Sequence, residues 1–156
     1  MAKRHPSLVL LSHDHHHALA LALRCRKHAL GQLSPGDPDA SKKLAQEVKE
    51  FFAQNLQSHF KAEEDILFPV IKAHAASDSE TLIEELHRDH ERITKTVSAL
   101  DKGTGLSKTL FDLGDILERH VRQEERTLFP IFEKAVPSGS ADQTGMEIEK
   151  ILRSTR

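Results

Sequence analysis

An eleven-residue motif occurs twice in the chain, as HFKAEEDILFP at 59–69 and as HVRQEERTLFP at 120–130. The two copies lie 61 residues apart and share His, two adjacent Glu, Leu, Phe and Pro in register. The His and the first Glu are four residues apart, so on a helix both side chains project from the same face. The repeat therefore predicts two helices of equal local geometry that present the same polar pair to a common interior.

Apolar residues follow helical spacing along the whole chain, and no sustained period-two pattern indicates a strand. The length of 156 residues fits one domain. We expect helices at about 8–30, 38–73, 77–100 and 108–135, joined by short loops that include 31–40. Four such helices fold most simply as an all-α, up-down-up-down four-helix bundle.

Several residues mark the expected ends and bends of these helices. Gly31 is placed to end the first helix, and Ser77 with Glu80 forms a capping box that predicts the start of the third. Pro69 and Pro130 fall inside the second and fourth helices, where each removes a backbone hydrogen bond and predicts a bend.

The bundle is predicted to occupy residues 1–136, followed by a different kind of segment at 137–156. Its first part, PSGSADQTG, has the composition of a linker. The spacing of apolar residues from Met146 to Leu152 then predicts a short amphipathic C-terminal helix that docks on the bundle.

Composition excludes several classes of partner. The formal net charge is −2 with basic and acidic residues interspersed, which does not favour nucleic acid or an anionic membrane. No apolar run approaches the length of a membrane span, so a cytoplasmic location is expected. Cys25 is the only cysteine, which excludes a disulfide within the chain and a Cys-based zinc site. Histidine, by contrast, occurs 11 times.

The internal repeat extends to the helices that precede each motif. Aligning Asp14 and His15 with Asp89 and His90 places the two halves in the same order, a His helix followed by an HxxxEExxLFP helix. The bundle is therefore predicted to be pseudo-twofold symmetric, with its inward polar groups at one level.

Six polar side chains are predicted to converge in the apolar interior, where unpartnered polar groups are costly. They are His15, His59, Glu63, His90, His120 and Glu124. Imidazole and carboxylate donors in this number describe a metal site, and two ions bridged by the carboxylates would use all six. Iron suits this donor set best, with zinc or manganese as alternatives.

Some assignments stay open at this level. His16 is the alternative to His15, and Glu125 is the alternative to Glu124. Two roles are open for Asp14 and Asp89, which either orient ligand histidines or lie on the surface. Glu64 and Glu125 either face solvent or form salt bridges just outside the ligands.

The segments HDH, HFKAEEDILFP, DH and HVRQEERTLFP together resemble the hemerythrin-like, or HHE, cation-binding domains over roughly residues 8–135. The resemblance implies a non-heme di-iron centre held by the six side chains, with Glu63 and Glu124 bridging the irons and an oxo group as a further option. Oxygen-carrying members have HxxxH where this chain has His90 and Thr94, and Asp in place of Glu125. The set of four His and two Glu resembles the bacterial members more closely.

Three functions are compatible with these residues. The first is a protein that binds or senses dioxygen, nitric oxide or peroxide, favoured because neutral imidazoles stabilise high-valent iron less than carboxylates do. The second, implied by the resemblance, is a di-iron enzyme of oxidative or nitrosative stress defence, in iron-sulfur repair or as a peroxidase. The third is an iron storage or sensing module whose fold metal binding stabilises. A protein partner is not predicted.

Overall fold

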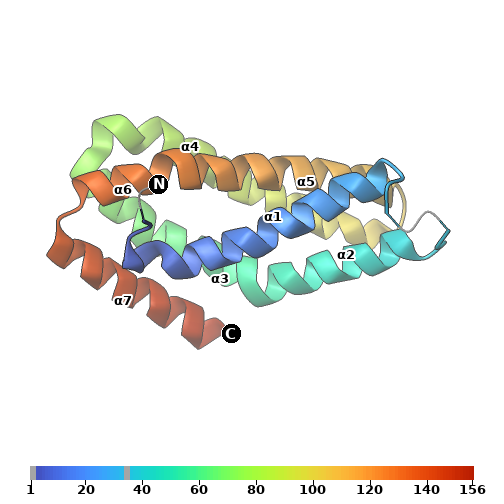
Figure 1. Ribbon diagram of the computed structural model, residues 1–156, viewed down its shortest axis with the longest axis horizontal. Helices are drawn as coiled ribbons and strands as arrows, with labels where there is room; N and C mark the ends of the chain where they lie inside the picture. Colours follow the sequence, from blue (N-terminus) through green and yellow to red (C-terminus); the bar gives the residue numbers. More distant parts are fainter. Residues whose placement is uncertain (1–2, 34–35) are drawn as a thin grey trace.

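The computed structural model describes residues 3–33 and 36–156, and these residues form helices, turns and short connections without any strand. Figure 1 shows long helices running side by side along one axis. The predicted all-α bundle is confirmed. Residues 1–2 of the predicted domain and 34–35 of the predicted loop lie outside the described part. None of the helices in that part has an apolar stretch of the length that a bilayer crossing needs.

The first and fourth helices of the bundle pack along each other. The first comprises the 3₁₀ turn η1 (Pro6–Leu8) and α1 (Val9–Ala29). The fourth comprises α5 (Leu106–Gln123), η5 (Glu124–Leu128) and α6 (Phe129–Ala135). Gly31 follows α1 with a left-handed φ of 73°, the conformation for which glycine is suited at a helix end.

The second and third helices are continuous through a bend. The second comprises α2 (Ala40–Phe51), η2 (Phe52–Leu56), α3 (Gln57–Ala62), η3 (Glu63–Leu67) and the start of α4 (Phe68–Ala99). Within α4 the backbone leaves helical geometry at Ala75, where φ is −150° and ψ is 45°. The break therefore lies two residues before the predicted capping residue Ser77. The 3₁₀ turn η4 (Leu100–Lys102) then leads into the loop before α5.

Each predicted proline bend is preceded by a π-helical turn. In η3 the Phe68 N–H donates to the Glu63 carbonyl, and in η5 the Phe129 N–H donates to the Glu124 carbonyl, five residues back in each case. Proline lacks the N–H that a regular α-helix would require at the next position. The π turn changes the bonding pattern before that position, so Pro69 and Pro130 sit in the first turn of α4 and α6.

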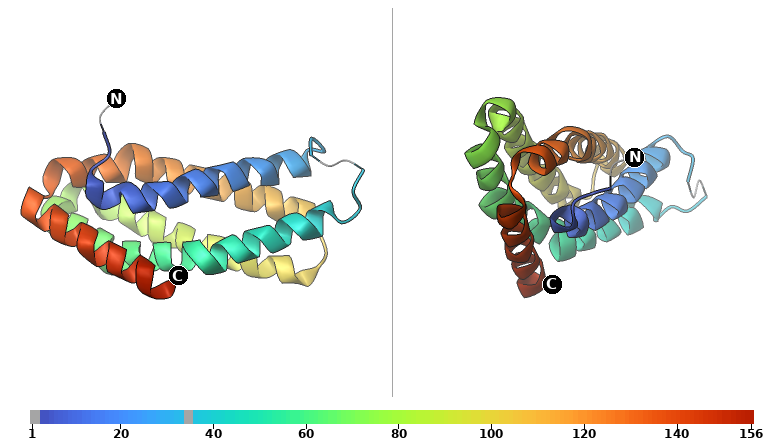
Figure 2. Two further views of the ribbon diagram at one scale, coloured as in Figure 1. Left: turned by 60° about the horizontal axis from the view of Figure 1, so that its bottom comes forward. Right: turned by 60° about the vertical axis from the view of Figure 1, so that its left-hand side comes forward.

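The segment expected to be a linker and a short helix is instead one helix, α7 (Ser138–Thr155). It packs beside α3 and η1, along the side of the bundle from one end toward the middle (Figure 2). The small residues that suggested a linker permit close packing, since the Cβ position of Gly145 lies 2.9 Å from Ser7 Cα. Ser7 Oγ also donates to the Ala141 carbonyl at 2.5 Å. Burial of apolar residues such as Ile148 outweighs weak helix propensity here.

Buried apolar residues form two separate clusters along the bundle. One contains Ala18, Leu56, Ile93 and Leu117, and the other contains Leu11, Ala62, Leu86 and Leu128. On every helix of the bundle the chain crosses from one cluster to the other at the level of a predicted ligand histidine. A layer of polar residues therefore separates the two apolar clusters.

The close crossing of α1 and α5 at Gly114 gives a stability prediction. A Cβ on Gly114 would lie 2.7 Å from the Ala22 carbonyl oxygen and 3.0 Å from Arg26 Cγ. We expect Gly114→Ala to lower the free energy of unfolding by about 1–3 kcal/mol, although alanine favours an isolated helix by about 1 kcal/mol. Urea denaturation measures the change. Gly139→Ala, where the Cβ meets open space, is the control and should leave stability unchanged or slightly raised.

Candidate metal centre

All six predicted ligand side chains lie in the polar layer, each at most 3% exposed. They come from four different helices of the bundle. Glu63 and Glu124 are the first residues of the π turns η3 and η5, and each is one turn after a histidine of the repeated motif. The repeat thus places both pairs at equivalent positions on two helices.

The six side chains form two overlapping groups of four. One group is His15, His59, Glu63 and Glu124, and the other is Glu63, His90, His120 and Glu124. Within each group one ligand atom from every residue lies within 4.8 Å of the others. Both carboxylates belong to both groups, which is the arrangement that two bridged metal positions require.

Each histidine of the centre has its Nδ1 within hydrogen-bonding distance of a carboxylate from another helix. The pairs are His15 with Glu125 (2.5 Å), His59 with Asp14 (2.9 Å), His90 with Glu64 (2.8 Å) and His120 with Asp89 (3.2 Å). An ionised carboxylate only accepts hydrogen bonds, so the Nδ1 of each ring is the donor. The lone pair of the neutral ring is then on Nε2, which faces the shared carboxylates and is suited to metal coordination.

The amino-acid sequence alone leaves the pairing of these carboxylates with the histidines open. Asp14 accepts a hydrogen bond from His59 on another helix and not from its neighbour His15. Asp89 likewise accepts from His120 and not from its neighbour His90. The available signal was that the same acidic residues recur at equivalent positions in both halves. Because adjacent residues on a helix point in different directions, that signal could not show which helix each carboxylate reaches.

The open alternatives separate clearly by position. His16 is exposed on the outer face of α1, whereas His15 is buried in the centre. Glu125 lies outside both groups of four and accepts from His15 Nδ1, whereas Glu124 belongs to both groups. Thr94, one turn after His90, uses its hydroxyl to donate to the His90 carbonyl at 2.8 Å.

The chemistry of the centre can be tested against a metal through its unpaired atoms. Within the described residues, Glu63 Oε2, Glu124 Oε2 and His120 Nε2 are buried without a hydrogen-bond partner. His120 Nε2 lies 3.2 Å from Glu124 Oε1, but without the geometry of a hydrogen bond. Leaving such atoms unpaired costs about 1–3 kcal/mol each. All three are atoms of the kinds that coordinate metals and belong to the two groups of four, so the donor set fits metal ions between them.

Without metal, the two shared carboxyls differ in charge state. Burial and the neighbouring Glu124 raise the pKa of Glu63 to about 8. Burial also disfavours the charge of Glu124, but the His120 ring holds the pKa of that carboxyl well below its usual range. For His120, burial opposes the charged form, yet Glu124 and the Asp89 hydrogen bond raise its pKa to about 10. At neutral pH the Glu63 carboxyl is therefore protonated and uncharged, and the His120 ring is protonated on both nitrogens.

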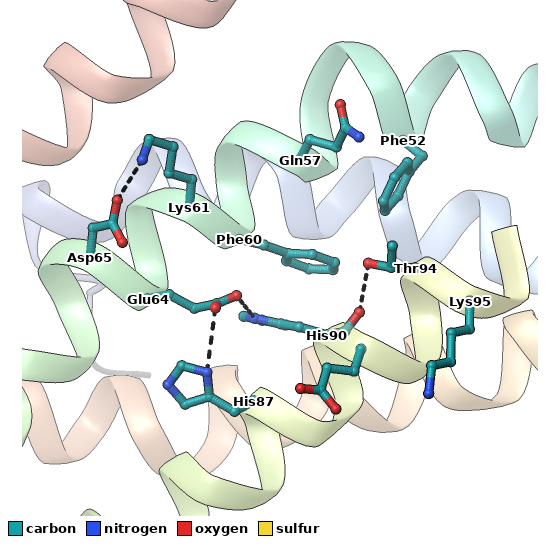
Figure 3. Close-up of a pocket in the computed structure, with 11 residues that line it drawn as sticks. Phe52, Gln57, Phe60, Lys61, Glu64, Asp65, His87, His90, Thr94 and Lys95 are labelled. Carbon is teal, nitrogen blue, oxygen red and sulfur yellow. Dashed lines mark hydrogen bonds and ion pairs between the residues drawn. The ribbon is translucent and has the colours of Figure 1, made fainter. Parts of the chain in front are cut away.

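A surface pocket of about 560 Å³ reaches the centre at His90 (Figure 3). Phe60 stacks on the His90 ring with centroids 3.9 Å apart and forms one wall. Glu64 connects the buried and exposed rings, because its Oε2 lies 2.8 Å from His90 Nδ1 and its Oε1 lies 3.4 Å from His87 Nδ1. Thr94 lines the same pocket. The half of the centre that contains His90 is therefore the half next to solvent.

The fold and the buried His and Glu groups define a metal-binding four-helix bundle. The model of the hemerythrin HHE cation binding domain matches residues 7–132, and the chain belongs to this family. A DNA nickase from Nostoc sp. (strain PCC 7120 / SAG 25.82 / UTEX 2576) is 29% identical over 109 residues, covering 67% of this chain. The chain spans only 31% of that relative's length. No solved structure matches the chain significantly.

The protons on Glu63 and His120 give a prediction for pH dependence. Metal coordination requires Glu63 and His120 each to lose one proton. Burial opposes the charge of His15 as well, but hydrogen bonds to Glu124 and Glu125 raise its pKa, so binding near pH 7 should release at least two protons per chain. The apparent affinity should therefore fall as the pH is lowered from about 8 to about 6. Zinc titration in weak buffer measures proton release, and competition with a chelator measures affinity. Equal affinity across this pH range would contradict the assigned protonation states.

Proposed function

We propose that the protein is a non-heme di-iron binding protein that binds or senses dioxygen, nitric oxide or peroxide. The observation that carries the proposal is the pair of four-residue groups that share Glu63 and Glu124. In this proposal His15 and His59 serve one iron, His90 and His120 serve the other, and the two glutamates bridge them. Zinc or manganese are the alternative metals for the same donors.

The surrounding residues support coordination by orienting the rings. Each imidazole is held by a carboxylate from a neighbouring helix, so the ring does not have to reorient when it coordinates. When bound, a pair of irons supplies one-electron redox chemistry and coordination positions that a small ligand can occupy. Four neutral imidazoles against two carboxylates favour ligand binding over the oxidations of carboxylate-rich sites.

The pocket beside His90 supports access by a small ligand. Its volume of about 560 Å³ exceeds the size of a diatomic molecule or a peroxide, and its walls include the apolar Phe52 and Phe60. Phe60 separates the pocket from the interior and contacts the His90 ring. We infer that a small ligand approaches the centre from this side.

A di-iron enzyme that consumes peroxide is the second candidate, favoured by polar groups in the same pocket. His87 is partly exposed there, and Glu64 lies between it and His90. These side chains would contact a peroxide in the pocket. Steady-state peroxide consumption above that of free iron would favour this candidate over a binding or sensing role.

The match to the Nostoc relative is too partial to carry that protein's named activity to this chain. The matched part covers less than a third of that protein. Three exposed arginines, Arg88, Arg92 and Arg119, line one hollow of the surface together with two acids, and the formal net charge of the chain is −2. This charge distribution does not favour a nucleic-acid backbone.

The test is anaerobic loading with ferrous iron, followed by metal analysis and visible spectra before and after exposure to nitric oxide, dioxygen or peroxide. About two irons per chain are expected, one for each group of ligands, together with a ligand-dependent spectrum. His120→Ala removes a ligand of one group and should reduce iron to about one per chain or less. His13→Ala, on the exposed face of α1, is the matched control and should bind as the unaltered protein does. Absence of bound iron after loading would refute the proposal.

A further inference from the structure

The two halves of the centre are equivalent in sequence but differ in what surrounds their outer carboxylates. Asp14 orients His59 in one half, and Asp89 is its counterpart that orients His120 in the other. Both aspartates are buried. Their contacts on the side away from the histidine are different, and this difference separates two metal positions that the repeat would make alike.

Asp14 is held from outside by Arg156, which directly follows α7. Arg156 Nη1 donates to Asp14 Oδ1 at 3.2 Å and Nη2 donates to Oδ2 at 2.7 Å. The same guanidinium donates to the Asn55 carbonyl at 2.9 Å and to Ser58 Oγ at 3.1 Å. Such a two-pronged pair fixes a carboxylate in both position and rotation. Arg156 therefore holds the Asp14 carboxylate, which in turn orients the His59 ring.

Asp89 has no such contact within the described residues. Arg88, Arg92 and Arg119 lie around it, but they line an open hollow of about 320 Å³ and none donates a hydrogen bond to its carboxylate. The Asp89–His120 pair is also longer, at 3.2 Å, than the Asp14–His59 pair, at 2.9 Å. His120 is therefore oriented by a carboxylate that lacks an outer clamp.

The carboxylates paired with His15 and His90 also differ in the side chains that hold them from outside. Glu125, the partner of His15, also accepts from Ser12 Oγ at 2.8 Å and from Arg4 Nη2 at 3.2 Å. Glu64, the partner of His90, faces the pocket and the exposed ring of His87. Among the described residues, arginines thus donate hydrogen bonds to both outer carboxylates of one half, and the outer carboxylates of the other half line surface pockets instead.

We propose that Arg156 is a positioning residue through which α7 acts as a latch on the His15–His59 half, so that this half releases its metal more slowly than the His90–His120 half. The inference rests on the proposed di-metal function and deepens it by making the two positions unequal. The family match ends at residue 132, so the latch belongs to a segment outside the matched domain. Small ligands and metal exchange would accordingly use the open half.

The physical reason lies in the movement that metal release requires. A ligand histidine must tilt or rotate before its metal can leave, and the Nδ1 hydrogen bond opposes that movement. For His59 the Asp14 carboxylate cannot follow the ring, because Arg156 holds it and is itself held by its bond to Ser58 Oγ. For His120, none of the described arginines holds the Asp89 carboxylate, so the carboxylate can move with the ring. Release from the His59 side should therefore be the slower of the two.

The experiment follows iron release from protein loaded with two ferrous ions, after mixing with an excess of a coloured ferrous chelator under anaerobic conditions. The unaltered protein should release its iron in two phases of equal amplitude. Arg156→Gln should speed the slow phase by about 10-fold, the low end for loss of an outer-shell partner, and leave the fast phase unchanged. Arg156→Lys, which keeps the charge but loses the two-pronged contact, should give an intermediate rate.

Matched variants separate positioning from general destabilisation. Arg153→Gln removes an arginine of α7 whose one ion-pair partner among the described residues is Glu149 on the same helix, and it should change neither phase. Asp89→Asn should speed the fast phase and leave the slow phase unaltered. Loss of the donors to buried Asp14 should lower the melting temperature of metal-free Arg156→Gln relative to metal-free Arg153→Gln. A general loss of stability would speed both phases of iron release, so acceleration of the slow phase alone identifies the positioning role.

Failure of the latch is distinguishable from failure of the di-iron proposal. Two ions released in a single phase, or equal acceleration of both phases by Arg156→Gln, would overturn the latch while leaving two bound irons. No bound iron in the unaltered protein would overturn the function itself and the latch with it.

Discussion

The hydrogen bond from an imidazole Nδ1 to a carboxylate on another helix is the interaction on which the rest of this structure depends. There are four of these bonds in the centre, and they form a closed ring. The first helix reaches the fourth through His15 and Glu125, and each other helix reaches the one before it. Every helix gives one histidine and one carboxylate to the ring. The ring therefore fixes which helices are neighbours, as well as the orientation of the ligands.

Such a ring is unusual as a source of stability, because it replaces apolar packing at the middle of the bundle. Two apolar clusters lie on either side of the polar layer, and these supply the burial that drives folding. In the part of the chain that the structure describes, three buried atoms of this layer have no hydrogen-bond partner. A bundle designed for stability alone would fill this level with leucine. The arrangement is therefore better explained by a ligand that those atoms bind.

The sequence was informative wherever one helix face decided the outcome. The periodic apolar stripe gave the helices of the bundle, and the His and Glu that interrupt it were placed at one level, as the structure has them. It was less informative wherever contacts between distant segments decide. Ser138, Gly139 and Gly145 have the composition of a linker, but they lie in a helix because α7 packs closely on η1. The clamp on Asp14 by Arg156 depends on the same packing, so no local pattern could have predicted it.

The π turns before Pro69 and Pro130 affect how this centre can change during evolution. A π turn holds one residue more than the α-helical turn it replaces, while the helix on either side keeps its packing face. Each turn therefore contains one additional residue, and the helix accommodates it without a change in packing outside the turn. Losing that residue would redirect the side chains within the turn, which include the shared Glu63 and Glu124 as well as Glu64 and Glu125. A change in the length of these turns would therefore alter the carboxylates of the centre, while the helices on either side keep their packing.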